Sequence, residues 1–139
     1  MENNRRMDMN KNRLETAEHL TKLGFHFENG VIESAGIHEM NGVATVSVVI
    51  RLASGGHCSL GGYSCGQFIP GNKTIKGSRF GFESLLWLMA IAGVDKSGDL
   101  GGQYVRVAMD SNDRASTIGH IFEDRWFSFM ALKKELEEA

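Results

Sequence analysis

One apolar segment, residues 80–92 with the sequence FGFESLLWLMAIA, constrains the fold more than any other part of the chain. Its length predicts a helix, and Gly93 directly after it is a typical helix C-cap. Because apolar residues occupy nearly every side of this helix, we expect it to be buried on every side. One sheet covers only one face. We therefore expect the N-terminal helix or a second subunit to cover the rest, and we favour a homodimer, which would also bury Trp87.

The segments on either side of this helix carry strand patterns. Residues 43–52 alternate, and the residues on their apolar face are Ala44, Val46, Val48, Ile50 and Leu52. Asn29-Gly30 and Asn41-Gly42 are tight-turn dipeptides. Together the patterns predict strands at residues 31–37, 43–52, 57–63, 103–108 and 115–121. The expected fold class is α+β: an antiparallel sheet of about five strands packed with a buried central helix on one face, plus N- and C-terminal helices.

The 139 residues are near the usual size of one domain, and we expect a single domain over residues 1–139. Residues 1–11 are expected to be frayed, residues 12–24 to form the N-terminal helix, and residues 25–128 to form the sheet-and-helix core. Residues 129–139 are expected to form a C-terminal helix capped by Ser128. Residues 64–77, which contain the only proline, are expected to form a long connection.

Charge and hydropathy exclude several classes of protein. A net charge of −2 and a pI near 6.2 argue against broad binding of duplex nucleic acid. No apolar run reaches the roughly 18 residues of a membrane span. The charged N-terminal stretch has no apolar segment behind it, so we expect no secretory signal and a cytoplasmic protein. Cys58 and Cys65 form no CxxC pair and are expected to be reduced, structural thiols.

Sequence patterns for catalysis or metal binding are missing. The histidines are scattered without HxxxH or HxH spacing, and no GxSxG motif occurs. Residues 66–74, GQFIPGNKT, resemble a phosphate loop, but Asn72 separates Gly71 from Lys73, and we reject ATPase activity. We therefore expect no catalytic site, no metal and no cofactor. Asp124 is the one acid we consider for catalysis, and its alternative role is to orient an arginine or cap a turn.

Two candidate ligand-binding regions lie near the start of the apolar helix. Gly61-Gly62-Tyr63 ends a predicted strand with two positions that let a ligand approach the backbone, and the alternative is a β-bulge. Arg79 lies at the helix N-terminus, where an anion such as phosphate is stabilised. Phe82 could contact a ligand or belong to the core, and composition alone favours the core.

A further candidate region begins in the last two predicted strands. Arg106 shares a strand face with Tyr104, where it could hold a phosphate, stack on a base or be solvated. His120 and Asp124 follow, and Trp126 could stack on a ring or close the core as a lid. Arginines, aromatic rings and small residues are what a nucleotide-like ligand requires, so the residues predict binding without bond cleavage.

Four motifs follow one another in a fixed order. They are Gly61-Gly62-Tyr63, GFE at residues 81–83, LGGQYVRV at residues 100–107, and IGHI at residues 118–121 with DRWF at residues 124–127. In this order they resemble a family of small phage proteins that includes the first-described Thoeris anti-defence sponge. The resemblance covers roughly residues 31–128 and leaves the N-terminal helix outside.

This resemblance implies a function. In Thoeris defence a TIR-domain enzyme converts NAD into a cyclic ADP-ribose isomer, which activates an effector that depletes NAD. The sponge binds this signal, glycocyclic ADP-ribose, without degrading it, in pockets between subunits of a homodimer. Some relatives form hexamers and also hold cyclic oligonucleotides. The family's aromatic residue at the helix start maps to Phe82 and its strand arginine to Arg106, whereas the basic loop before the helix departs from the family pattern and leaves the isomer open.

Two other functions remain open at this point. One is an enzyme that cleaves a cyclic nucleotide, with Asp124 or His120 as the base. The other is an inhibitor that binds a protein of another host defence. A sponge would release intact ligand, an enzyme would release linear ADP-ribose, and a protein inhibitor would co-purify with a host protein.

Overall fold

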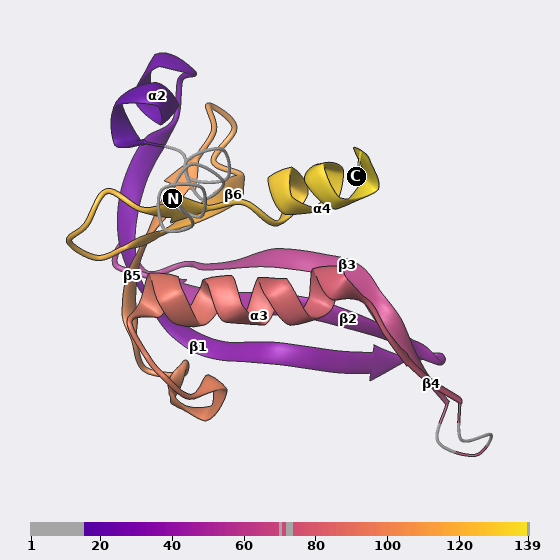
Figure 1. The fold of residues 1–139 in the computed structure, drawn as a ribbon. Coiled ribbons are helices and arrows are strands. Elements are labelled where there is room, and N and C mark those ends of the chain that lie inside the picture. The colour runs from indigo at the N-terminus through magenta and orange to yellow at the C-terminus, as the bar shows by residue number, and fades with distance from the viewer. Residues whose placement is uncertain (1–15, 70, 72–73, 139) are drawn as a thin grey trace, which may run out of the picture.

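The computed structural model describes residues 16–69, 71 and 74–138. Their elements, in chain order, are α2 (Ala17–Lys22), β1 (His26–Met40), β2 (Val43–Leu52), β3 (His57–Ile69), β4 (Thr74–Gly77), α3 (Arg79–Ala92), the 3-10 turn η2 (Ser97–Asp99), β5 (Tyr104–Met109), β6 (Ala115–His120), β7 (Trp126–Phe127) and α4 (Phe129–Glu138). Figure 1 shows α3 lying across the sheet. The expected frayed end, residues 12–15 of the expected N-terminal helix and residue 139 lie outside the described residues.

The fold is α+β, with an antiparallel sheet in the order β4-β3-β2-β1-β5-β6-β7. The sheet has seven strands in the described residues rather than about five. The two additional strands, β4 and β7, are the short ones at its edges, and short edge strands carry too few residues to show an alternation in the sequence. No helix in the described part of the chain is long and apolar enough to cross a membrane.

The predicted turn at Asn29-Gly30 is wrong, because β1 runs straight through it from His26 to Met40. Gly30 pairs with Leu52 of β2 on one side and with Val105 of β5 on the other. A Cβ atom built on Gly30 would lie 2.5 Å from Ile50 Cγ2, so this glycine is needed for close strand packing. The Asn41-Gly42 turn is confirmed, with φ of 53° and 83° as a tight hairpin requires.

The predicted connection at residues 64–77 is also wrong for most of its length. β3 continues to Ile69, and β4 pairs back onto it from Thr74 to Gly77. Gly61 and Gly62 lie inside β3 with φ of 90° and 85°, where the register between β2 and β3 shifts. The alternative interpretation of this glycine pair, a β-bulge, is therefore confirmed.

The central helix α3 is not buried on every side. Leu88 and Ile91 are buried against the sheet, whereas Phe82 is 67% exposed and Leu86, one turn later, is 47% exposed. Trp87 is half-buried within the chain, where its ring stacks on Phe127 at 5.8 Å with an interplanar angle of 4°. The strand β7 and the helix α4 thus cover one flank of α3, and the flank with Phe82 and Leu86 stays open within the chain.

The helix α2 packs on the sheet face opposite α3, so the expectation that the helices share one face is wrong. Leu20 of α2 is buried with Ala108 and Trp126, while the neighbouring Val107 belongs to the core beneath α3. Adjacent strand residues point to opposite faces, which separates these two cores. The predicted end caps are confirmed for α3 and α4: Gly93 has a φ of 75°, and Ser128 Oγ accepts a hydrogen bond from Ala131 N at 3.2 Å.

Candidate ligand-binding site

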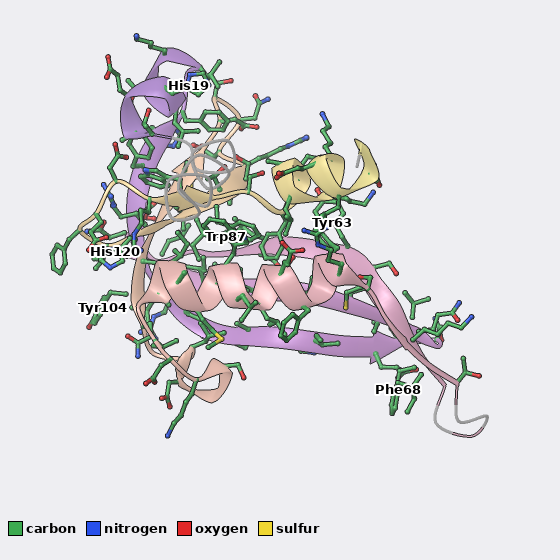
Figure 2. All side chains as sticks on the ribbon, viewed as in Figure 1. His19, Tyr63, Phe68, Trp87, Tyr104 and His120 are labelled. Atoms are coloured by element: carbon green, nitrogen blue, oxygen red, sulfur yellow. The ribbon has the colours of Figure 1, made fainter. Side chains whose placement is uncertain are left out.

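The helix α3 separates the seven candidate residues into two groups. Arg79 is its first residue, and the ring of His120 lies beside Gly93, which follows its last residue. A helix of 14 residues is about 20 Å long. Figure 2 shows Tyr63 and His120 near opposite ends of α3. A single chain therefore does not gather the seven residues into one cavity.

The N-terminal end of α3 borders an open hollow of about 320 Å³. Ser78 caps the helix, with its Oγ accepting a hydrogen bond from Gly81 N at 3.2 Å, and Arg79 forms an ion pair with Glu83. The hollow is lined by Ser64, Ser78, Arg79, Phe80, Lys133, Leu136 and Glu137. A helix N-terminus with two cationic side chains can attract an anionic group, although Glu83 and Glu137 balance both cations.

Tyr63 and Phe82 both lie near the N-terminal end of α3, but Tyr63 is packed against other side chains and Phe82 is exposed. The ring of Tyr63 packs edge-on against Phe80 with centroids 6.1 Å apart, and Lys133 Nζ lies 5.8 Å from that ring. Tyr63 does not line the hollow at Arg79, but it lines a separate hollow of about 300 Å³ together with Gly61, Phe129 and Met130. The Phe82 side chain lies on the open flank of α3, so the alternative that it belongs to the core does not hold. An exposed aromatic ring on a helix is available for stacking.

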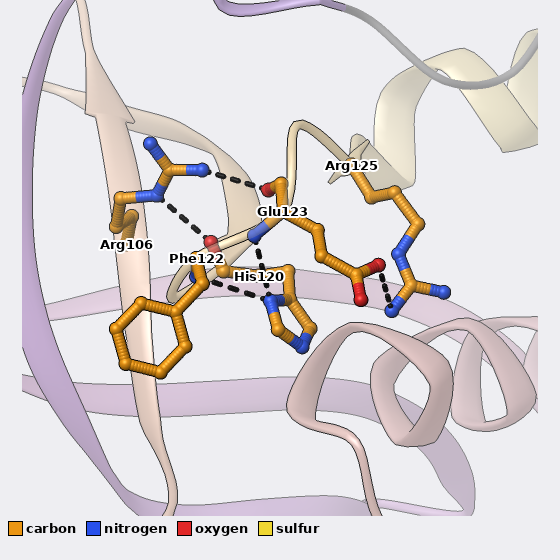
Figure 3. A network of polar contacts seen from close by, with 5 residues as sticks. All are labelled: Arg106, His120, Phe122, Glu123 and Arg125. Atoms are coloured by element: carbon orange, nitrogen blue, oxygen red, sulfur yellow. Dashed lines mark hydrogen bonds and ion pairs between the residues drawn. The ribbon is translucent and has the colours of Figure 1, made fainter.

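At the other end, Arg106 of β5 holds the loop between β6 and β7. Its Nε donates to the carbonyl oxygen of His120 at 2.8 Å, and its Nη2 donates to the carbonyl oxygen of Glu123 at 2.7 Å (Figure 3). Its guanidinium also lies 4.7 Å from the ring centroid of Trp126. These contacts direct the charged group of Arg106 toward its own chain.

The other three candidates at this end also make structural hydrogen bonds. His120 Nδ1 accepts from the backbone N–H groups of Phe122 at 3.1 Å and Glu123 at 2.9 Å. Asp124 Oδ1 accepts from Trp126 Nε1 at 2.9 Å and from Ala17 N at 2.7 Å. Trp126 is fully buried, as expected of a lid on a core, and its ring packs 4.9 Å from that of Phe27.

No pattern in the sequence indicated Phe122, which is 87% exposed in this loop. A lone aromatic residue between a strand and a polar turn has no periodicity from which its exposure could be inferred. Beside the loop, a shallow polar hollow of about 650 Å³ opens at the end of α3, lined by Gly93, Val94, Asp95, Gly98, Asp99, Gly101 and Gln103. The C-terminal end of α3 thus combines the exposed ring of Phe122 with a polar hollow.

The titratable side chains at both ends of α3 and the two cysteines can be compared with the requirements of catalysis. No group of three or more His, Cys, Asp or Glu side chains within the described residues could hold a metal ion. Burial raises the pKa of the Cys58 thiol to about 11 and also raises the pKa of Cys65, so neither thiol is activated as a nucleophile. Asp124 Oδ1 and His120 Nδ1, on the two residues considered as bases, each accept two hydrogen bonds from within the chain.

No family model, curated protein or solved structure matches the chain.

Proposed function

We propose that this chain is a phage anti-defence protein that binds and sequesters glycocyclic ADP-ribose made by a TIR-domain enzyme in the host cytoplasm, and that it leaves the signal intact. The observation that carries the proposal is the use of the candidate bases. Asp124 and His120 accept structural hydrogen bonds, while Arg79, Lys133 and Phe80 line the open hollow at the N-terminal end of α3. This arrangement favours recognition over bond cleavage.

Sequestration needs tight binding, and a nanomolar site corresponds to about 12 kcal/mol. Ligand pockets generally enclose most of their ligand and have volumes of about 300–1,000 Å³. The hollow at Arg79, about 320 Å³ and open to solvent, is at the lower limit of that range. We therefore propose that a second copy of the chain encloses the ligand.

A homodimer in which the open flanks of two α3 helices pack antiparallel supplies that enclosure. Phe82 and Leu86 would be buried at its centre, which accounts for their exposure in one chain. Because each α3 is about 20 Å long, the pairing would bring Arg79 and Phe82 of one subunit next to His120 and Phe122 of the partner subunit. Two equivalent composite pockets would result, and assembly into hexamers would use other surfaces.

The decisive experiment is co-expression of this chain with a TIR-domain enzyme, followed by purification and heat denaturation. Mass spectrometry of the released small molecules should recover intact glycocyclic ADP-ribose. Recovery of linear ADP-ribose would support a cleaving enzyme instead. A co-purified host protein, together with no thermal shift on adding the cyclic nucleotide, would support an inhibitor of a protein partner.

The subunit arrangement has its own test. Phe82→Asp places a charge in the middle of the proposed interface and should convert the dimer to a monomer in light scattering, without unfolding the chain. Met40→Asp is the matched control, because Met40 is similarly exposed but lies at the far end of β1. A dimer that survives Phe82→Asp would exclude the α3 interface.

A further inference from the structure

We propose that Phe122 is the ring that contacts the ligand at the C-terminal end of α3, and that Arg106 and His120 act on the ligand only by positioning Phe122. This inference rests on the proposed function, because it concerns the same ligand. It changes the role of Arg106, which the sequence pattern and the family resemblance both place at a phosphate.

The exposure of Phe122 is the first argument. At 87%, it is the highest among the large hydrophobic side chains that are exposed in the described part of the chain. Water disfavours an apolar ring of this size, so a ring held out in this way is best explained by a partner that covers it in the working complex.

The second argument is that the loop holds this ring out by direct contacts. Arg106 bonds the carbonyl groups of His120 and Glu123, on either side of Phe122, at 2.8 and 2.7 Å. His120 Nδ1 bonds the N–H groups of Phe122 and Glu123 from inside the loop, and Arg125 pairs with Glu123 at 2.8 Å. Figure 3 shows these contacts surrounding the base of the Phe122 side chain. A loop fixed at so many points presents its ring with little loss of entropy on binding.

The third argument concerns the direction of the guanidinium group. Two of the N–H groups of Arg106 donate to backbone carbonyls, and its flat face lies over the buried ring of Trp126. The two N–H groups that hold the loop are therefore not free for a phosphate, which could reach only the other N–H groups of the guanidinium. The positioning role needs no rearrangement of these contacts.

The kind of partner follows from the surroundings. The rings of Phe122 and His120 have centroids 6.5 Å apart, and the polar hollow at Gly93 opens on the His120 side. An aromatic face beside a polar hollow suits a flat heterocycle with polar substituents, such as the adenine of the proposed ligand.

The test is calorimetry with glycocyclic ADP-ribose as the probe, on the full chain. Phe122→Ala should weaken binding about tenfold or more, because base stacking is lost. Phe122→Trp, which keeps an aromatic face, should stay within about threefold of the wild type. Met40→Ala, at a similarly exposed apolar position remote from the loop, is the control and should leave the affinity unchanged.

A double-mutant cycle tests the positioning role. Arg106→Ala should weaken binding in the wild-type background but have no further effect in the Phe122→Ala background, because its only route to the ligand is then absent. A further loss in the double variant would show that Arg106 touches the ligand and would overturn this part of the inference. Rescue by Arg106→Lys would also count against it, because one ammonium cannot bond both carbonyls in the same fork geometry.

Three other outcomes separate the inference from the proposed function. A wild-type chain that binds no glycocyclic ADP-ribose would overturn both. A wild-type chain that binds, with Phe122→Ala equal to it, would overturn the inference alone. A Phe122→Ala chain that turns monomeric in light scattering would also overturn it, since Phe122 would then be a subunit contact rather than a ligand contact.

Discussion

The two ends of α3 use the same kinds of residue in different ways. At the N-terminal end, Arg79 and Phe82 are carried by the helix itself, and both side chains are exposed. At the C-terminal end, Arg106 and Trp126 are turned inward, and they support a loop that exposes Phe122 instead. An arginine near an aromatic residue in a sequence can therefore be exposed for binding, or it can hold in place a loop that exposes another residue. Hydrogen bonding and burial decide which.

Trp126→Ala should have the largest effect on stability, because this ring is fully buried and supports the C-terminal end. Truncation of a large buried aromatic residue costs about 3–5 kcal/mol of unfolding free energy. Phe122→Ala, four residues earlier in the chain but exposed, should change that free energy by no more than about 0.5 kcal/mol. Urea denaturation measures both changes in unfolding free energy. Equal losses would contradict the distinction between Trp126, which supports the loop, and Phe122, which is exposed on it.

Asp124→Ala should come next. It would leave the buried Trp126 indole N–H without its acceptor, at a cost of about 1–3 kcal/mol. Asp124→Asn keeps a side-chain oxygen at the same place and should lose less. If both substitutions cost the same, the charge of Asp124 rather than its acceptor oxygen would be what stabilises this end, and thermal melts of the three proteins would show it.

Gly81→Ala tests the packing of the N-terminal end of α3 against β3. A Cβ atom there would lie 2.5 Å from Cys65 Cβ, so α3 must shift away from β3. Overpacking costs about 1–3 kcal/mol, and the better helix propensity of alanine returns up to about 1 kcal/mol. Burial raises the pKa of the Cys65 thiol, so we expect iodoacetamide to label it slowly in the wild type. In Gly81→Ala the labelling should be faster, because the shift of α3 uncovers this thiol. Gly98→Ala, where a Cβ atom meets nothing within 4 Å, should leave the labelling rate unchanged.

Phe82→Ala should have the smallest effect on folding, within about 0.5 kcal/mol, because its ring is exposed in the single chain. Its effect should be on dimer formation and on affinity for glycocyclic ADP-ribose. A melting curve recorded on diluted monomer separates the two effects. A loss of several kcal/mol in that monomer would show that Phe82 belongs to the core after all.

The sequence predicted the fold well where the pattern is local and repeated. The alternation in β2 and the caps at Gly93 and Ser128 required only neighbouring residues, and all are confirmed. It failed at Asn29-Gly30, because the requirement for glycine there comes from Ile50 on another strand. It also overestimated the burial of α3, since composition shows that a helix is apolar but not how many elements remain to cover it.

The candidate site was harder to predict for the same reason. Arg106, His120 and Trp126 were identified as residues with unusual chemistry, and the structure places them together around one loop. The hydrogen-bond partners of Arg106 and His120 are backbone groups of residues 120–123, which no side-chain pattern reveals. The exposure of the Phe122 ring results from those hydrogen bonds to the loop backbone, and no pattern in the sequence indicates it.

The carboxylate of Asp124 joins two segments that are far apart in the chain. One oxygen accepts from the first residue of α2 and from the indole beneath the Phe122 loop. Any event that pulls α2 from the sheet must therefore remove one bond from an oxygen that also steadies the loop. A ligand bound at the Phe122 loop would be thermodynamically linked to the docking of α2, so a change within α2 that weakens its docking would lower the affinity for a ligand that α2 does not touch.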